Sequence, residues 1–479
     1  MYLHYIALIA RQCSNLCTIL QTSCPQDDLR CIKLQIEAPF KLTLQVFDAD
    51  VWQDAMILEF TEPQAGFAGP CRYAYESVYL EHHLDRIETL FRAAVSVRVP
   101  PTWGRESLKQ APAFLYDLAP AGAAKRFLLN RIGAEKPDNL SSDLFLLARS
   151  TPAPIGHMRI KESARTEANR AVIGFARKEV VERDNRFLEY AYEQGAAIGG
   201  ATGAGGEAPK LLLAQGHDGL LYPDAVLEDA QVTQHWFIKF ARNQGLQRDQ
   251  DILRSEYHFY KALQVLGIET VAAEGLALEE ATKPSVWMHR FDRAVSDKGV
   301  ERFAVESIYS AAGNTAPGSS MDHVKVVQLL ANLWKTAGQS EQITDLVVDY
   351  LRRDLLNKIL GNSDNHGRNT SIIRGPDSLR LAPIYDLAPM VMDDEGITRT
   401  TKWPGALEVA GDVDWRGVCN VLAQVVDPDA TYERLREEAQ RLRALPDILV
   451  ASGLPEVTLN HPRIALRELD RRLAEWGLR

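Results

Sequence analysis

The sequence lacks three features that would each assign it to a class: a long apolar run, a cysteine framework and an excess of positive charge. No stretch of the 479 residues is apolar for the length that a membrane-spanning helix needs, so we expect no membrane partner. Only six cysteines occur, four of them between positions 13 and 31, and their spacing fits neither a disulfide-rich secreted domain nor a zinc site. The formal net charge of −10 argues against a protein that coats nucleic acid or an anionic membrane, so we expect no direct nucleic-acid binding by the chain alone.

The start of the chain also lacks a convincing targeting signal. The apolar segment 5–10 is short, no basic residue precedes it, and Arg11 interrupts it. Together with the scattered thiols, this predicts a reducing, cytoplasmic location. Residues 1–38 show no clear periodicity, and we treat them as an N-terminal extension of unknown role.

What the sequence does contain is the length and composition of a soluble protein with more than one domain. Within residues 39–165, the segments 41–52, 55–60 and 76–83 have β-like patterns, whereas 84–94 and 123–133 have helical ones. We expect a small, β-rich N-terminal subdomain there.

A glycine-rich segment opens a second region, residues 166–285. Six glycines occur within positions 195–206, and strand-like runs follow at 208–214, 235–240 and 286–291. Between the last two runs, residues 249–267 have helical periodicity and end at Gly267.

The third region, residues 286–479, is mostly helical in this interpretation. Helices are predicted at 323–335, 344–362, 432–445 and 463–476, and a hairpin at 369–384 follows the polar loop NSDNHGRN. The overall prediction is an α+β chain.

The residues that carry chemistry occur in a fixed order along these regions. A glycine-rich loop is followed by a strand lysine, Lys239, and a helix glutamate, Glu256; much later come Asp364 and Asn369 in a polar loop and Asp386 after a hairpin. This is the order of parts in a protein kinase. Glycine backbone can approach phosphates, a lysine supplies a fixed positive charge, and carboxylate and amide oxygens suit Mg²⁺. The order therefore predicts an ATP- and Mg²⁺-dependent phosphotransferase.

Each part has a simpler explanation when it is considered alone. The glycine-rich segment reads as a flexible linker, and it is not a Walker A loop, because Glu-Ala-Pro-Lys follows Gly206. Lys239 alone would be a surface lysine, Glu256 a solvated helix residue, and Asp386 a helix N-cap. His366 is interpreted as a structural residue that braces the loop. Only the collinear order favours the phosphotransferase hypothesis.

Several of these motifs together resemble the HipA family of toxin kinases. The resemblance rests on GGEAPKLLL, WFIKF, SEYHFYKAL, HRFDR, NSDNHGRNTSII and LAPIYDLAP, with APAFLYDLAPAGAAKRFLL and STPAPIGHMRI further upstream, and it extends from about residue 40 to the C-terminus. It implies a two-lobed, protein-kinase-like fold with an added N-terminal subdomain and a mostly helical C-terminal lobe. It also implies Ser/Thr protein phosphorylation with ATP.

The resemblance also implies residue roles. Asp364 resembles the catalytic aspartate, Lys239 the ATP-binding lysine, and Glu256 its helix partner, whereas Asn369 and Asp386 look like the Mg²⁺ ligands. The remaining nucleotide contacts that it implies are Gly205, Gly206, Lys210, His289, Phe291 and Asp292.

Partners and regulation follow from the same resemblance. Family members phosphorylate aminoacyl-tRNA synthetases and are restrained by a small DNA-binding antitoxin of the HipB type. Some carry an autophosphorylated serine before the lysine of the glycine-rich loop; here Gly203 stands near that place, and Thr202 is a candidate substitute. Two alternatives stay open: a kinase for a small molecule, and a pseudokinase that acts as a binding module.

Overall fold

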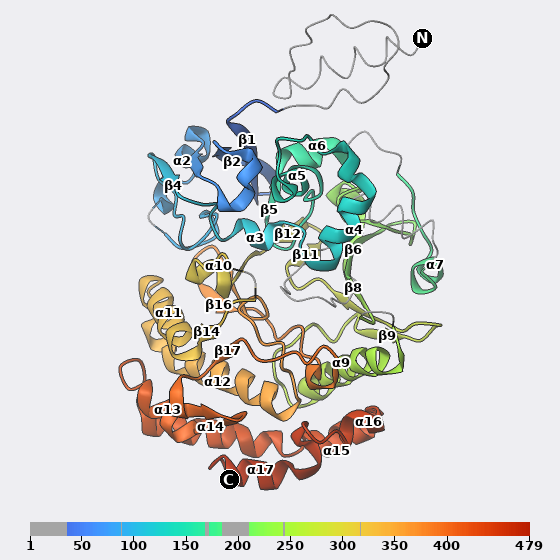
Figure 1. Cartoon of the computed structure of the whole chain (residues 1–479), viewed down its shortest axis with the longest axis vertical. Helices are drawn as coiled ribbons and strands as arrows, with labels where there is room; N and C mark the ends of the chain where they lie inside the picture. The colour runs from blue at the N-terminus through green and yellow to red at the C-terminus, as the bar shows by residue number, and fades with distance from the viewer. Residues whose placement is uncertain (1–35, 88, 168–171, 184–209, 243–244, 317) are drawn as a thin grey trace, which may run out of the picture.

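The computed structural model describes residues 36–87, 89–167, 172–183, 210–242, 245–316 and 318–479. Helices and strands are mixed along the chain, which confirms the predicted α+β class. Figure 1 shows a β-sheet from the N-terminal part at one end of the molecule and the helices from α13 (Trp415–Val421) to α17 (Leu469–Glu475) at the other. The division into domains at residues 38, 165 and 285 stays a prediction.

The N-terminal sheet is antiparallel. In spatial order it contains β4 (Arg105–Leu108), β3 (Cys71–Tyr75), β2 (Val51–Phe60), β1 (Phe40–Asp48) and β5 (Met158–Ile160). The segment 41–52, predicted as one strand, is a hairpin, because Ala49 and Asp50 adopt positive φ angles of 49° and 63°, as a tight two-residue turn requires. The buried face of the N-terminal sheet packs against α3 (Leu115–Leu118), α4 (Gly122–Ile132) and α5 (Ser142–Arg149), and α6 (Lys161–Glu167) lies beside β1.

Two predicted elements of this part are wrong. Residues 76–83, predicted as strand-like, contain the short helix α2 (Ser77–His82), in which the neighbours Tyr79 and Leu80 are both buried. The described residues of 84–94, a segment predicted as a helix, contain one 3-10 turn at Leu84–Arg86 and no α-helix. The prediction for 123–133 is confirmed by α4.

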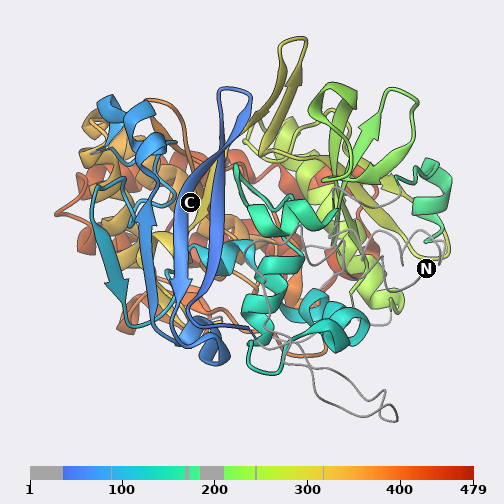
Figure 2. The same cartoon turned by 90° about the horizontal axis from the view of Figure 1, so that it is seen from above.

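A second sheet contains the strand that bears Lys239. Its order is β7 (Leu221–Pro223), β6 (Lys210–Gly216), β8 (Val232–Phe240), β10 (Ser285–His289) and β9 (Ala277–Glu279). The strands β6, β8 and β10 confirm three predicted runs, and α9 (Gln247–Val265) confirms the predicted helix. Seen from above in Figure 2, this sheet and the N-terminal sheet lie on different sides of the molecule.

The C-terminal part is mostly helical, as predicted. Besides α13 and α17, its helices are α10 (Ile308–Ala312), α11 (His323–Thr336), α12 (Ile343–Ile359), α14 (Pro428–Leu442), α15 (Leu445–Ser452) and α16 (Glu456–Leu459). A small sheet is formed by β13 (Ala304–Ser307), β15 (Ser371–Arg374) and β16 (Leu379–Leu381), so the predicted hairpin is confirmed. The remaining short elements are α7 (Arg177–Val181), β11 (Arg293–Ser296), β12 (Gly299–Arg302), β14 (Met321–Asp322), β17 (Thr401–Lys402), β18 (Glu408–Val409) and β19 (Asp412–Val413).

One apolar core joins the second sheet to the helical part. Phe259 and Leu263 of α9 lie in the same cluster as Val286 of β10 and Leu351 and Leu355 of α12. The residues between these elements are therefore held on a shared, packed support.

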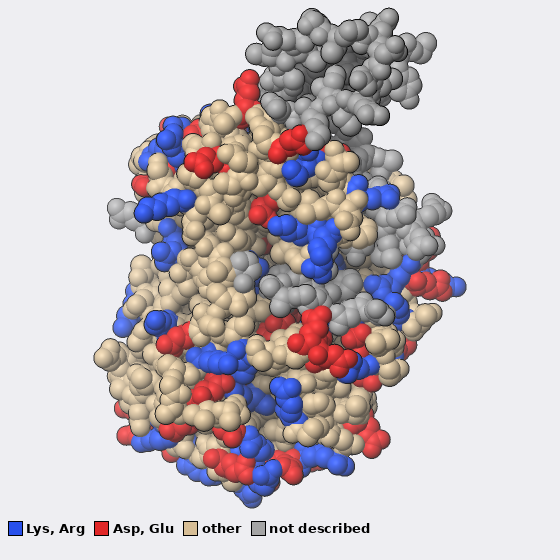
Figure 3. Space-filling model, viewed as in Figure 1, with Lys and Arg blue, Asp and Glu red and all other residues tan. Residues whose placement is uncertain are grey.

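The surface carries both signs of charge. In Figure 3, Lys and Arg side chains are interspersed with Asp and Glu side chains over the lower half of the face shown. Many of them are paired, for example Arg443 with Asp470 at 2.6 Å. Over the described part of the chain, no helix combines the length and the apolar character needed to cross a bilayer.

Candidate active site

Lys239 lies near the end of β8, on the face of the strand that points to a cavity. Side chains alternate along a strand, so Ile238 enters the core on one face while Phe237 and Lys239 line the cavity on the other. Lys210 of β6 is the register partner of Lys239 and also lines the cavity. Two ammonium groups thus face the same cavity and require negative charge nearby.

Glu256 of α9 supplies part of that charge. Its side chain is buried, Lys239 Nζ donates to its Oε2 at 2.5 Å, and the Tyr260 hydroxyl donates to its Oε1 at 2.7 Å. Tyr260 is one helical turn from Glu256, so α9 fixes the carboxylate on both oxygens. The predicted lysine–glutamate contact is therefore present.

Asp386 supplies the rest of the negative charge that faces the two lysines. Lys239 Nζ donates to Asp386 Oδ1 at 2.5 Å, and Lys210 Nζ donates to Oδ2 at 3.0 Å. Burial alone would lower the pKa of Lys239, but the carboxylates of Asp386 and Glu256 outweigh it and raise that pKa. Burial would likewise raise the pKa of Asp386, but the two lysines hold it well below its ordinary value.

The backbone at Asp386 is unusual for a non-glycine residue. Its φ angle is +55°, a conformation that costs free energy and is found mainly where the surrounding structure imposes it. The strain coincides with the carboxylate that both lysines contact, which is the pattern expected of a functional position.

Asp364 and Asn369 lie in the polar loop after α12. Asn369 Nδ2 donates to the Asp364 carbonyl oxygen at 2.6 Å, which ties the two ends of the loop together. The Asp364 carboxylate lies 3.6 Å from His366 Nε2 and 4.0 Å from Arg242 Nη1. Burial, the largest influence, lowers the pKa of His366, so this imidazole is neutral near pH 7, consistent with the predicted bracing role.

The loop also depends on a glycine. A Cβ atom on Gly367 would lie 2.5 Å from Cδ1 of Tyr309 and 2.7 Å from the Met321 sulfur. Tyr309 is buried and its hydroxyl donates to the Ser319 carbonyl at 2.7 Å, so its ring cannot easily move away. Position 367 therefore requires glycine for the loop to pack against Tyr309 and Met321.

The predicted metal ligands suit a hard cation. Asn369 Oδ1 is buried and accepts no hydrogen bond from any described residue, whereas Asp386 offers a carboxylate. Among the described residues, no cluster of three or more His, Cys, Asp or Glu side chains is arranged to hold a metal. Two oxygen ligands from the protein fit Mg²⁺, which commonly takes its remaining ligands from water and substrate phosphates.

Two adjoining cavities connect the described candidate residues other than Asn369, which lines a separate cavity. One, of about 110 Å³, is lined by Lys210, Lys239, Glu256 and Asp386 together with residues 288–292. A smaller one, of about 20 Å³, shares those four residues and adds Asp364 and Arg242. The structure therefore brings together Lys239, Glu256, Asp364 and Asp386 from four separate segments.

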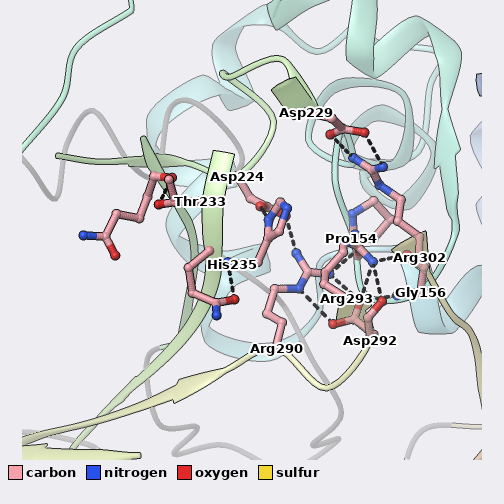
Figure 4. Close-up of polar contacts among 12 residues, drawn as sticks. Pro154, Gly156, Asp224, Asp229, Thr233, His235, Arg290, Asp292, Arg293 and Arg302 are labelled. Atoms are coloured by element: carbon pink, nitrogen blue, oxygen red, sulfur yellow. Dashed lines mark hydrogen bonds and ion pairs between the residues drawn. The ribbon is translucent and has the colours of Figure 1, made fainter. Parts of the chain in front are cut away.

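Residues 289–292, here called the connector, lead from the end of β10 to the start of β11 and differ from one another in what their side chains contact. Phe291 lines the larger cavity and stacks on Tyr385 with ring centroids 5.3 Å apart. His289 also lines it, and burial lowers the pKa of its ring. Asp292, in contrast, is 2% exposed and belongs to a buried charge network (Figure 4).

That network occupies the carboxylate of Asp292. It accepts from Arg290 Nε at 2.9 Å, from Arg290 Nη2 at 2.6 Å, from Arg293 Nη1 at 2.7 Å and from the Gly156 amide at 2.7 Å. Burial alone would raise the pKa of Asp292, but the two arginines lower it to about 2. Arg290 also contacts Asp224, which pairs with His235 (Figure 4). These contacts fix the segment that bears Asp292, which also lines the larger cavity, and its predicted contact with a nucleotide stays a prediction.

Some predicted residues lie outside the described part, and some lining residues were not predicted. Gly205, Gly206 and Thr202 are outside the described residues. The unpredicted residues that line the larger cavity include Tyr116, Asp117, Ser307, Arg368 and Tyr385. One signal could have found the first two: the pentapeptide Tyr-Asp-Leu-Ala-Pro occurs at 116–120 and again at 385–389.

Comparisons with known proteins bear on the family and the fold of this chain. The sequence model of the HipA-like C-terminal domain matches residues 202–445, which include every one of the candidate catalytic, nucleotide-binding and metal-binding positions. Among solved structures, HipA of Shewanella oneidensis MR-1, in a toxin–antitoxin complex with HipB and operator DNA, matches with a TM-score of 0.58 at 16% identity, over 91% of this chain and 96% of that chain. At this identity the likeness is one of fold.

A more distant match is the proinflammatory kinase CtkA of Helicobacter pylori, with a TM-score of 0.33 at 13% identity, over 58% of this chain and 92% of that chain. This score is too low to support conclusions about the present chain. No curated protein sequence matches.

Proposed function

This chain belongs to the family of proteins with a HipA-like C-terminal domain, and from that premise we propose that it is an ATP- and Mg²⁺-dependent Ser/Thr protein kinase. The observation that carries the proposal is the position of Lys239, whose ammonium group contacts Glu256 and Asp386 at 2.5 Å each on the wall of a cavity. A buried lysine paired with a helix glutamate, with a loop aspartate beside it, is part of the arrangement that protein kinases use for phosphoryl transfer. In this proposal the second sheet and α9 form one lobe, and the helical part forms the other.

The residues divide the work of transfer among them. Lys239 and Lys210 bind the phosphate groups, and Glu256 keeps Lys239 in place when Asp386 takes up a metal ion. Asn369 and Asp386 would hold Mg²⁺, which neutralises charge on the phosphate oxygens when it is bound. Asp364 orients the acceptor hydroxyl and accepts its proton as the bond between this oxygen and the γ-phosphorus forms and the bond from the γ-phosphorus to the bridging oxygen breaks, which releases ADP.

Nucleotide binding and metal binding are expected to be coupled. The Asp386 carboxylate is shared by two ammonium groups in the free protein, so a cation at Asp386 competes with both lysines. A triphosphate offers these lysines new anionic partners at the same time. Each ligand therefore lowers the cost of binding the other.

Partners are proposed by analogy with the family. The Shewanella HipA structure is a complex with HipB and operator DNA, and this supports a HipB-like DNA-binding antitoxin for the present chain. The proposed acceptor is a cytoplasmic protein, with an aminoacyl-tRNA synthetase as the first candidate from the family resemblance. Growth arrest by the free kinase is the proposed biological outcome.

Labelling of a cell lysate tests the proposal. The wild-type protein, γ-labelled ATP and Mg²⁺ should label a protein on serine or threonine, and Asp364→Asn should reduce labelling at least about 100-fold, because the acceptor proton loses its base. Asp364→Asn should still bind MgATP, since Lys210, Lys239 and Asp386 remain. Label that enters a small molecule, or labelling that persists in Asp364→Asn, would contradict the protein-kinase assignment.

A further inference from the structure

The N-terminal part of the chain contributes a carboxylate to the candidate active site. Tyr116 and Asp117 of α3 line the same cavity as Lys239 and Asp386, although they lie about 85 residues before the matched family domain begins at residue 202. Ile155, between α5 and β5, lines it as well. One wall of the cavity is therefore built by a region outside that domain.

Asp117 is held in place on both of its oxygens. Oδ1 accepts a hydrogen bond from the Ser307 hydroxyl at 2.8 Å, and Oδ2 accepts one from the Ser307 amide at 3.1 Å. Oδ1 also lies 3.4 Å from Nε of Arg368. Asp117 thus connects α3 with the start of α10 and with the loop that bears Asp364 and Asn369.

Arg368 immediately precedes the candidate metal ligand Asn369, and its backbone is fixed. Its amide donates to His366 Nδ1 at 3.3 Å, and its carbonyl accepts from the Tyr385 hydroxyl at 2.5 Å. Its side chain is only 6% exposed and lines the cavity. Within the described part of the chain, Arg368 Nη1 and Nη2 donate no hydrogen bond, and Nε lies beside Asp117 without donating one. The guanidinium thus keeps its two outer nitrogens available within a cavity that already contains Lys210 and Lys239.

The repeated pentapeptide holds Arg368 from two sides. In the first copy, Asp117 contacts the guanidinium; in the second copy, Tyr385 binds the carbonyl oxygen and Asp386 contacts the lysines. A guanidinium whose Nε lies in an ion pair with a carboxylate, and whose two Nη groups donate no hydrogen bond to a described residue, can bind a phosphate group through both Nη groups.

We propose that Arg368 is a phosphate-binding residue of this site and that Asp117 is the positioning residue that orients it. The ligand class is the phosphate chain of a nucleoside triphosphate, so the inference rests on the proposed function and deepens it. Asp117 acts only through Arg368. The N-terminal part of the chain is then required for full phosphate binding, and the family domain alone is incomplete.

Calorimetric titration of the full-length protein with MgATP and with adenosine tests this directly. Arg368→Met should weaken MgATP binding about 10- to 100-fold, the effect of losing one or two charge-assisted hydrogen bonds, and should leave adenosine binding within about twofold. Arg368→Lys should recover part of the loss, because the charge is retained but the fork is not. Asp117→Asn should weaken MgATP binding about three- to tenfold, and the double variant Asp117→Asn/Arg368→Met should bind like Arg368→Met alone.

Arg380→Met is the matched control, because Arg380 is 48% exposed and its contacts, an ion pair with Glu269 and a position over the Phe303 ring, lie outside the cavity; the variant should bind both ligands like the wild type. An equal loss of MgATP and adenosine affinity in Arg368→Met would show a structural role and overturn the inference. Unchanged MgATP affinity in Arg368→Met would also overturn it while leaving the kinase proposal intact. A wild-type protein that binds no MgATP would overturn both.

Discussion

Replacing Asp386 by asparagine should destabilise the protein before any ligand is added. Asp386 is the counter-ion shared by Lys210 and Lys239, whose side chains are 11% and 8% exposed. In the variant, Lys239 keeps Glu256, but Lys210 loses the carboxylate that it contacts at 3.0 Å. Removing one partner of a buried ion pair costs about 3–5 kcal/mol, and the remaining Glu256 contact places the expected loss near the lower end, about 3 kcal/mol.

The pH dependence of the stability difference between wild type and Asp386→Asn provides a second test of this prediction. Because the pKa of Asp386 is held well below its ordinary value in the folded state, its contribution to stability is fully present above the unfolded-state pKa of about 3.9 and is lost as the pH falls below it. The difference in the free energy of unfolding between wild type and Asp386→Asn should therefore be constant from about pH 5 to 7. It should shrink progressively below about pH 4.

Urea unfolding followed by circular dichroism at several pH values measures both effects. Asp377→Asn, on the exposed turn between β15 and β16, makes the same chemical change without a buried partner and should leave the free energy of unfolding within about 0.5 kcal/mol of wild type. If Asp386→Asn is as stable as Asp377→Asn at pH 7, the two lysines do not depend on Asp386. In that case the electrostatic account of the site is wrong.

Two further changes test the loop between α12 and β15. Gly367→Ala should lower the free energy of unfolding by about 1–3 kcal/mol, because its Cβ would approach Tyr309 to 2.5 Å; an unchanged urea midpoint would contradict this. Asn369→Ala should raise the Mg²⁺ concentration needed for half-maximal ATP binding by about tenfold or more, since one of two oxygen ligands is removed; an unchanged Mg²⁺ titration would exclude Asn369 as a ligand.

The parts of the site that could be predicted are those encoded by local pattern and chain order. Lys239 on a strand and Glu256 on the next helix follow from hydrophobic periodicity, and both elements form as expected. The hairpin before Asp386 was predicted from its turn residues, and it forms. Their convergence on one cavity could be expected only because the order matched a known arrangement.

The helix predicted at 84–94 does not form because of contacts with residues that are distant in the sequence. The composition of this segment favours a helix, but its carbonyl groups find partners elsewhere: Arg374 Nη1 donates to Phe91 O at 2.8 Å and to Ala94 O at 2.5 Å, and the Tyr79 hydroxyl donates to Ala93 O at 2.6 Å. These contacts replace the helical hydrogen bonds. A guanidinium some 280 positions away in the sequence cannot be recognised as the partner from a local window.

The contact between Asp117 and Arg368 was missed for a related reason. Each residue alone looks like an ordinary charged side chain, and only the packing of α3 against the loop before β15 brings them within 3.4 Å. Similarly, the four donor groups around the Asp292 carboxylate could be seen only in three dimensions, whereas its predicted contact with a nucleotide stays a prediction.

The central claim is that Asn369 and Asp386 hold a divalent cation beside a nucleotide that Lys239 contacts. A crystal of the full-length protein grown with Mn²⁺ and a non-hydrolysable ATP analogue tests it most directly, because Mn²⁺ takes the place of Mg²⁺ and gives an anomalous signal. The account predicts an anomalous peak at about 2.1 Å from both Asn369 Oδ1 and an Asp386 carboxylate oxygen. If nucleotide is bound but the anomalous peak lies at other residues, the account is contradicted. It is also contradicted if nucleotide is bound, Lys239 still contacts Asp386, and no anomalous peak lies near Asp386.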